Sequence, residues 1–233
     1  MEWLCLLLRR ARILALIIMK SFLKQLLLVL FLLCCSFMKA QDKLGFCPLQ
    51  VADFLSKDYN ERMERILQDH LSEDYLVRCI YMPSFDPEWV LQIERVPKLG
   101  NYQIITLSFE KNLWYHKNDT IRMTKNTMHI EQDKAMKIID LTHLFLENKS
   151  NTLLVGCLDG ETIQFEINLC NNQQCGATIC PSENSLTGRL VKSFEVLKEG
   201  VISGTINQEA FDDLIDCLFN EASAYYKGEN FEE

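Results

Sequence analysis

The stretch LLVGCLDGETIQFEINL, residues 153–169, carries the clearest secondary-structure pattern in the chain. It contains an Asp159-Gly160 pair, a dipeptide that accepts the positive φ angles of a tight hairpin turn. Strict alternation of apolar and polar residues is typical of a strand with one buried and one solvated face. After the turn, four apolar residues alternate with polar ones: Ile163, Phe165, Ile167 and Leu169. The stretch therefore predicts a β-hairpin, with Phe165 packed into the core.

Other segments predict further strands and several helices around this hairpin. Apolar residues at helical spacing predict a first helix over 58–71 and a second over 133–149. A third helix begins near Leu186 and ends at Gly200, and a capping box of Thr205 and Gln208 opens a fourth. Strands are expected over 76–81, 89–96 and 102–109, with shorter ones over 113–115 and 127–130. This order predicts an α+β fold, in which an antiparallel sheet of about five to seven strands packs against three or four helices.

The N-terminal region has the three parts of a secretory signal when it is read from Met19. Two lysines precede an apolar core of about twelve residues, which is shorter than the roughly 20 residues of a membrane span. We expect cleavage between Ala40 and Gln41, which assigns residues 1–40 to a signal peptide and 41–233 to a single α+β domain. The chain would then be periplasmic or extracellular. The alternative is a retained membrane anchor over residues 13–37.

Charge and composition narrow the classes of partner. Residues 1–40 hold six basic residues and one acidic residue, so the remainder carries 18 Lys and Arg against 31 Asp and Glu, a formal net charge of −13. Such a domain is repelled by phosphate backbones, so we expect no nucleic-acid partner. Contact with a membrane is expected only through the N-terminal segment, if that segment is not cleaved. No cofactor is expected.

Seven of the ten cysteines lie beyond residue 40, which is heavy use for a chain of this length. An exported protein meets an oxidising compartment, where up to three disulfides could form and at least one thiol would stay unpaired within the chain. The segment CNNQQCGATICP gives the disulfide candidates Cys170, Cys175 and Cys180. Three thiolates and a histidine could also bind zinc, but the spacing departs from that of zinc ribbons, and we favour a loop-closing disulfide over a metal site.

Catalytic signatures are scarce. The sequence contains no GxSxG elbow, P-loop, HExxH helix or Rossmann glycine fingerprint. His143 has Asp140 three residues before it and Glu147 four residues after it, so the three side chains share one helical face and could orient a base. Exposed helices commonly carry such charged faces. We therefore lean towards a protein that is not an enzyme, with these three residues as the catalytic candidates.

The segment IYMPSFDPEWVLQI offers a candidate contact surface. Pro83 and Pro87 each fix one φ angle and remove one backbone donor, so the loop before the 89–96 strand is stiff. Phe85 and Trp89 could be exposed for binding at low ordering cost, or could fold onto the core. We favour the core placement and keep both residues as binding candidates.

Three short segments, PSFDPEW, LDGETIQF and CGATICPSENSLTGRLV, resemble in this order a group of bacterial exported proteins of uncharacterised function. That group has a Pro-Ser-Phe loop, a Leu-Asp-Gly hairpin and a Gly-x-Thr-Trp-Ser-Pro turn before a helix. Here Ile179-Cys180-Pro181 replaces Trp-Ser-Pro. The likeness spans most of residues 76–198 and implies a shared α+β domain without implying an activity.

These observations lead to two functional hypotheses. The leading one is a non-enzymatic exported domain that binds another protein or an envelope component. Its basis is the acidic charge, the stiff aromatic loop, the expected disulfides and the absence of catalytic motifs. The alternative is an exported hydrolase or thiol-dependent enzyme whose site is assembled in space around His143 or the cysteine segment.

Overall fold

The computed structural model describes residues 43–44, 57–96, 101–117, 119–150, 160–169 and 172–228. These residues form four helices and one sheet of six strands, which confirms the predicted α+β class. The helices are α3 (Lys57–His70), α4 (Gln132–Glu147), α5 (Leu186–Ser203) and α6 (Gln208–Lys227). The strands are β1 (Tyr75–Pro83), β2 (Trp89–Arg95), β3 (Tyr102–Phe109), β4 (Met123–Ile130), β5 (Glu161–Leu169) and β6 (Asn172–Ile179).

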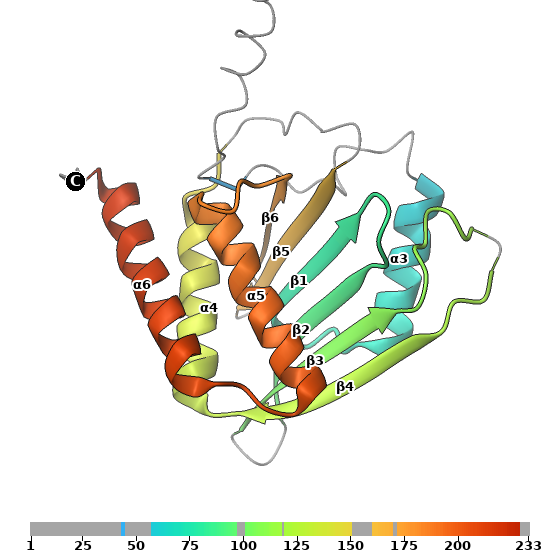
Figure 1. Cartoon of the computed structure of the whole chain (residues 1–233), viewed down its shortest axis with the longest axis horizontal. Coiled ribbons are helices and arrows are strands. Elements are labelled where there is room, and N and C mark those ends of the chain that lie inside the picture. Colours follow the sequence, from blue (N-terminus) through green and yellow to red (C-terminus); the bar gives the residue numbers. More distant parts are fainter. Residues whose placement is uncertain are drawn as a thin grey trace, which may run out of the picture. The chain divides into compact units, whose positions relative to one another are not determined.

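The sheet is antiparallel throughout, with the strand order β4-β3-β2-β1-β5-β6. Strands β1 to β4 follow one another outward from the centre, as expected for strands joined by short connections. Helix α4 follows the edge strand β4, and the chain then re-enters the sheet as β5, on the other side of β1 (Figure 1). Strand β1 is therefore central and pairs with β2 on one side and with β5 on the other.

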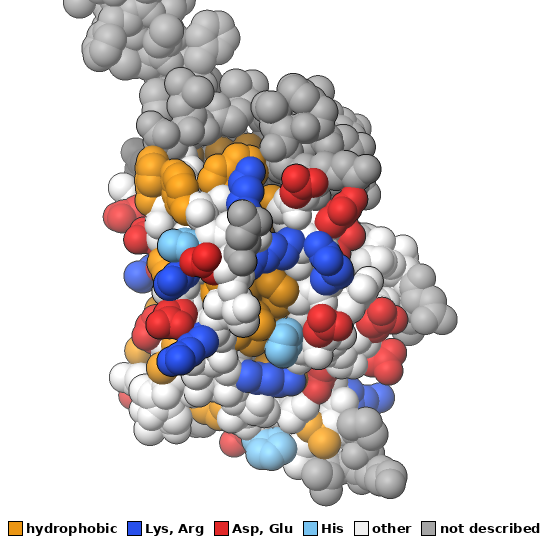
Figure 2. Space-filling model, turned by 90° about the vertical axis from the view of Figure 1, so that its right-hand side faces the viewer, with side chains coloured by type: hydrophobic (Ala, Val, Ile, Leu, Met, Phe, Trp, Pro, Cys, Tyr) orange, Lys and Arg blue, Asp and Glu red, His pale blue; other side chains and the backbone are white. Residues whose placement is uncertain are grey.

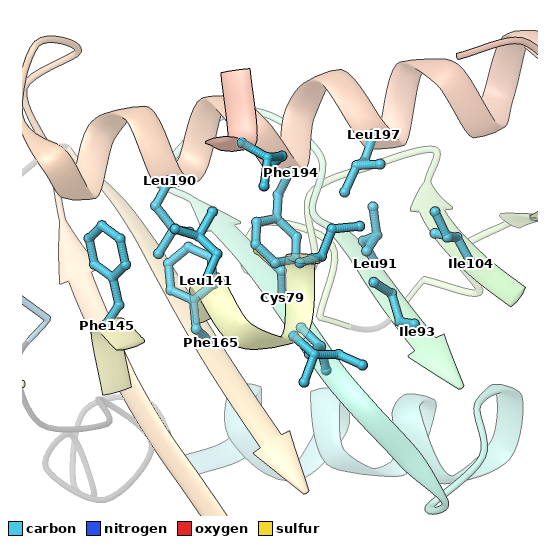
Figure 3. Packing of buried hydrophobic residues seen from close by; sticks show 14 of the residues in the cluster. Cys79, Leu91, Ile93, Ile104, Leu141, Phe145, Phe165, Leu190, Phe194 and Leu197 are labelled. Carbon is cyan, nitrogen blue, oxygen red and sulfur yellow. The ribbon is translucent and has the colours of Figure 1, made fainter. Parts of the chain in front are cut away.

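Helices α4, α5 and α6 form the core with one face of the sheet. Their apolar stripes meet every second residue of the strands, because side chains alternate between the two faces of a strand. Figure 3 shows Leu190, Phe194 and Leu197 of α5 above Phe165 of β5 and Leu91 of β2. The rings of Phe165 and Phe194 meet edge to face with centroids 5.2 Å apart. Helix α6 packs against α4 and α5.

Helix α3 covers part of the opposite face, where Met63 and Leu67 pack against Ile80, Val90 and Ile105. Because both faces of β1, β2 and β3 carry buried side chains, these strands are mostly apolar instead of strictly alternating. Figure 2 views the molecule from the side on which α3 lies in Figure 1, and acidic and basic side chains are interspersed there.

Two local predictions are wrong at element boundaries. Residues 113–115 form a turn instead of a strand, because the Asn112 side-chain oxygen accepts hydrogen bonds from the backbone N–H groups of Trp114 (2.9 Å) and Tyr115 (3.3 Å). Helix α5 continues through Gly200 and ends at Gly204, which has the left-handed φ of 75°.

Helix α6 is also capped differently from the expected capping box at Thr205 and Gln208. The Asn207 side chain accepts a hydrogen bond from Ala210 N–H and is the N-cap of the helix. Asparagine is among the preferred N-cap residues, so this assignment follows the same physical rule at a neighbouring position.

Strand β6 occupies most of the segment that was expected to be a cysteine loop. The expected hairpin places its second strand correctly as β5, whereas residues 153–159 and Cys170 lie outside the described residues, as do the predicted signal peptide and anchor. Among the helices of the described residues, none combines the length and apolar character that crossing a bilayer requires.

Candidate binding surface at one end of the sheet

Three segments that are far apart in the sequence meet where β1 ends and β5 begins. The Ser84 hydroxyl donates a hydrogen bond to the Gly160 carbonyl (2.5 Å), and the Tyr81 hydroxyl donates to the Glu161 carboxylate (2.6 Å). The Cys180 N–H donates to the Glu161 carbonyl (2.9 Å). These are parts of the three segments singled out in the sequence. We call their surface, residues 83–88, 160–161 and 180–195 together with Tyr115 beside Phe85, the loop-end surface.

The 83–88 loop is held by a neighbouring turn. The Asn112 amide donates hydrogen bonds to the carbonyls of Pro83 (3.1 Å) and Asp86 (2.7 Å), while its oxygen holds the 113–115 turn. On the other side of that turn, the Arg62 guanidinium of α3 donates to the carbonyls of His116 and Asp119, each at 2.7 Å. The 83–88 loop and the segment that contains the 113–115 turn are therefore both held in place by side-chain hydrogen bonds.

Glu88 adds a buried link between these elements, and nothing in the sequence pattern singles it out. Its carboxylate is 1% exposed and accepts hydrogen bonds from Leu113 N–H (2.9 Å) and from the Tyr59 hydroxyl (3.1 Å). Burial raises the pKa of the Glu88 carboxyl above its usual range, against the opposing effect of these donors and of Arg62. The carboxylate joins α3, the start of β2 and the 113–115 turn.

The two predicted binding residues have different surroundings. Phe85 is 62% exposed and stacks on Tyr115, which is 57% exposed, with ring centroids 6.2 Å apart and an interplanar angle of 12°. Trp89 is 5% exposed, and its ring stacks on Tyr81 at 5.1 Å within the core. Phe85 therefore lies on the surface beside Tyr115, whereas Trp89 is buried against Tyr81.

The loop-end surface is hollowed in three adjoining places, with volumes of about 350, 440 and 490 Å³. Tyr81, Asp86, Glu161 and Pro181 are each shared between two of these hollows. The basic side chains of this surface have acidic partners, such as Lys192 with Glu195 at 3.1 Å and Arg189 with Glu221. Asp86, Glu161 and Glu183 form no ion pair with any described residue, which leaves the surface with excess negative charge.

The turn before α5 is tightly constrained. Cys180 has a left-handed φ of 45°, which is uncommon for a residue with a side chain. Ser185 caps α5 by accepting the Gly188 N–H at 3.0 Å. A Cβ atom at Gly188 would lie 2.0 Å from the Ser182 carbonyl oxygen, so only glycine fits this close approach.

The cysteine candidates lie on or next to β6. Cys175 lies within the strand and Cys180 directly after it. Five residues of extended chain span about 16 Å, well beyond the Cα separation of a disulfide, so these two cysteines do not pair with each other. No disulfide joins two described cysteines, and a pairing that involves Cys170 stays a prediction.

The catalytic candidates lie on the surface of α4. His143 Nε2 lies 3.5 Å from Glu147 Oε1 on α4, with side chains 35% and 56% exposed, and Asp140 is also exposed. This is a surface pair between residues four apart on a helix, an arrangement worth little in free energy. In the described part of the chain, no group of three His, Cys, Asp or Glu side chains is placed to hold a metal ion.

Comparison of the chain with protein-family models, curated proteins and solved structures gave no match.

Proposed function

We propose that the domain is a non-enzymatic, exported binding module that recognises another protein through the loop-end surface, with Phe85 as the anchoring side chain. The observation that carries this proposal is the stacked, exposed pair of Phe85 and Tyr115. Large aromatic side chains normally lie mostly buried, and those that stay exposed on a fixed scaffold are typical anchors of protein interfaces.

Preorganisation supports the same interpretation. Binding normally loses free energy when side chains and loops become ordered at the interface. Here Asn112 already fixes the 83–88 loop, and Glu88 and Arg62 already fix the loop that carries Tyr115. Most of that ordering is complete before a partner arrives.

The excess negative charge of the surface indicates the chemistry of the partner. Asp86, Glu161 and Glu183 would attract a segment that carries Lys or Arg beside an apolar side chain. The apolar side chain would lie against Phe85, and the basic residues would lie over the carboxylates. Association of this kind is weakened by salt.

The test is affinity recovery of partners from envelope fractions of the native host with immobilised protein. We expect Phe85→Ala to reduce recovery of a specific partner by about tenfold or more, because anchoring aromatics dominate binding free energy. Tyr225→Ala is the matched control, since it removes an aromatic ring that is 46% exposed on α6.

Equal recovery by Phe85→Ala and wild type would overturn the proposal. Equal loss in Phe85→Ala and Tyr225→Ala would overturn it as well, because the effect would then not belong to the loop-end surface.

A further inference from the structure

A separate cavity lies on the opposite face of the sheet, between α3 and residues of β1, β5 and β6. Its volume is about 440 Å³, within the range of small-molecule sites. Leu67 of α3 and Leu71, directly after that helix, form an apolar wall, while Tyr75, Arg78 and Glu166 contribute from the sheet. The cavity therefore combines an apolar side with a charged floor.

The floor is a connected polar network. Arg78 Nη1 lies 3.4 Å from Glu166 Oε2, and the two side chains are 10% and 9% exposed. The Tyr75 hydroxyl donates to the same carboxylate oxygen at 2.8 Å and accepts from the Gln173 amide at 2.7 Å. The Arg78 guanidinium also stacks on the Tyr75 ring, 3.9 Å from its centroid. These contacts fix the floor before any ligand is present.

Arg78 has more N–H donors than it has acceptors among the described residues. Its Nε donates to Gln92 (3.0 Å), Nη1 donates to Glu166, and Nη2 donates to the Ser72 carbonyl (3.1 Å). A guanidinium has five N–H donors, so two of them have no acceptor among the described residues. Burying an ion pair is costly compared with apolar packing, so a buried pair that lines a cavity is a candidate ligand contact.

The rim of the cavity is acidic. Glu64 and Glu73 are exposed, line the cavity and form no ion pair with a described residue. With Glu166 and Arg78, the lining has three carboxylates against one guanidinium. A ligand that carries a cationic group is therefore favoured at the rim, and one with acceptor oxygens is favoured at the floor beside Arg78.

We propose that this cavity binds an amino sugar. Its ammonium group would lie near Glu73 and Glu64, and its hydroxyl oxygens would accept hydrogen bonds from Arg78. A carboxylate ligand would be repelled by the excess negative charge. A polyamine has no oxygen acceptor for Arg78, and a neutral sugar leaves the rim carboxylates without a cation. Of these four ligand classes, the amino sugar offers both a cation for the rim and oxygen acceptors for the floor, and its binding does not depend on the loop-end surface.

The experiment is calorimetric titration of the intact purified protein with glucosamine, glucose, N-acetylglucosamine and spermidine. We expect glucosamine to bind most tightly, and its affinity to fall as ionic strength rises. Glu73→Gln should weaken glucosamine binding about threefold, the size expected for an exposed charge pair. Asp213→Asn is the matched control, because it neutralises an exposed carboxylate on α6.

Several results would overturn this proposal. They are no heat of binding with glucosamine, equal affinity for glucosamine and N-acetylglucosamine, tighter binding of spermidine than of glucosamine, and equal effects of Glu73→Gln and Asp213→Asn. Because Glu73 is exposed on a loop, we expect Glu73→Gln to fold like the wild type, and circular dichroism checks this directly.

Discussion

Among individual residues, Glu88 buries a carboxylate where the 83–88 loop becomes β2. Burial raises its pKa above the ordinary value of about 4.5, so the folded state holds this proton more tightly than the unfolded state does. The stability that it contributes is present below the ordinary pKa and is lost as pH rises through the raised pKa. We expect the free energy of unfolding of the wild type, measured relative to Glu88→Gln, to fall as pH rises above the ordinary pKa of about 4.5.

Urea unfolding of both proteins at several pH values measures this difference. A difference that stays constant, or that grows towards neutral pH, would show that the hydrogen bonds from Leu113 and Tyr59 outweigh the cost of burying the charge.

The different placements of Phe85 and Trp89 could not be predicted from the sequence. Phe85 and Trp89 stand four residues apart in one proline-bounded segment, and both were expected to favour the core. Trp89 enters it because it begins β2 and faces Tyr81 across the β1–β2 pair. Phe85 stays outside because its loop is held by Asn112, whose contacts are set by the tertiary fold.

Among the single elements, the first turn of α5 is a place where replacing glycine with alanine should lower stability instead of raising it. Gly→Ala inside a helix normally stabilises by about 1 kcal/mol. At Gly188 the new methyl group would meet the backbone carbonyl of Ser182 at 2.0 Å, and backbone cannot move aside as a side chain can. We expect Gly188→Ala to lower the free energy of unfolding by about 2 kcal/mol, as overpacking does.

Chemical denaturation measures this loss, with Glu199→Ala on the exposed side of the same helix as a control that should change stability by less than about 0.5 kcal/mol. A stabilised Gly188→Ala protein would refute the close approach of the 180–185 turn to α5.

Elements with strong periodicity were predictable and weakly patterned ones were not. The sequence of β5 alternates and α4 carries one apolar stripe, so both elements follow from the sequence. The solvated face predicted for β5 is wrong, because Gln164 and Glu166 are buried in the fold. Strand β6 is mostly polar at its start and was mistaken for a loop, since its position depends on pairing with β5. The polar floor of the cavity was missed for the same reason, because Tyr75, Arg78 and Glu166 meet only through the register of β1 and β5.

At the scale of the whole domain, the same strands contribute side chains to two apolar clusters, one on each face of the sheet. Val77 and Cys79 of β1 pack with α4 and α5, whereas Ile80 of the same strand packs with α3. The two sides of the sheet should therefore unfold together. We expect Phe194→Ala to cost about 3–5 kcal/mol, because it removes a fully buried ring that faces Phe165, and to keep a single unfolding transition.

Differential scanning calorimetry and tryptophan fluorescence check this expectation. Two separate transitions in Phe194→Ala would show that the α3 side of the sheet is stable without the other helices.

Site-specific photocrosslinking in the native host tests most directly whether a partner protein meets the domain at Phe85. A photoreactive phenylalanine derivative would replace Phe85 in one protein and Tyr225 in another. We expect a discrete crosslinked species from position 85 that excess unlabelled wild-type protein suppresses and that position 225 does not give. The same species from both positions, or none from position 85, would contradict this expectation.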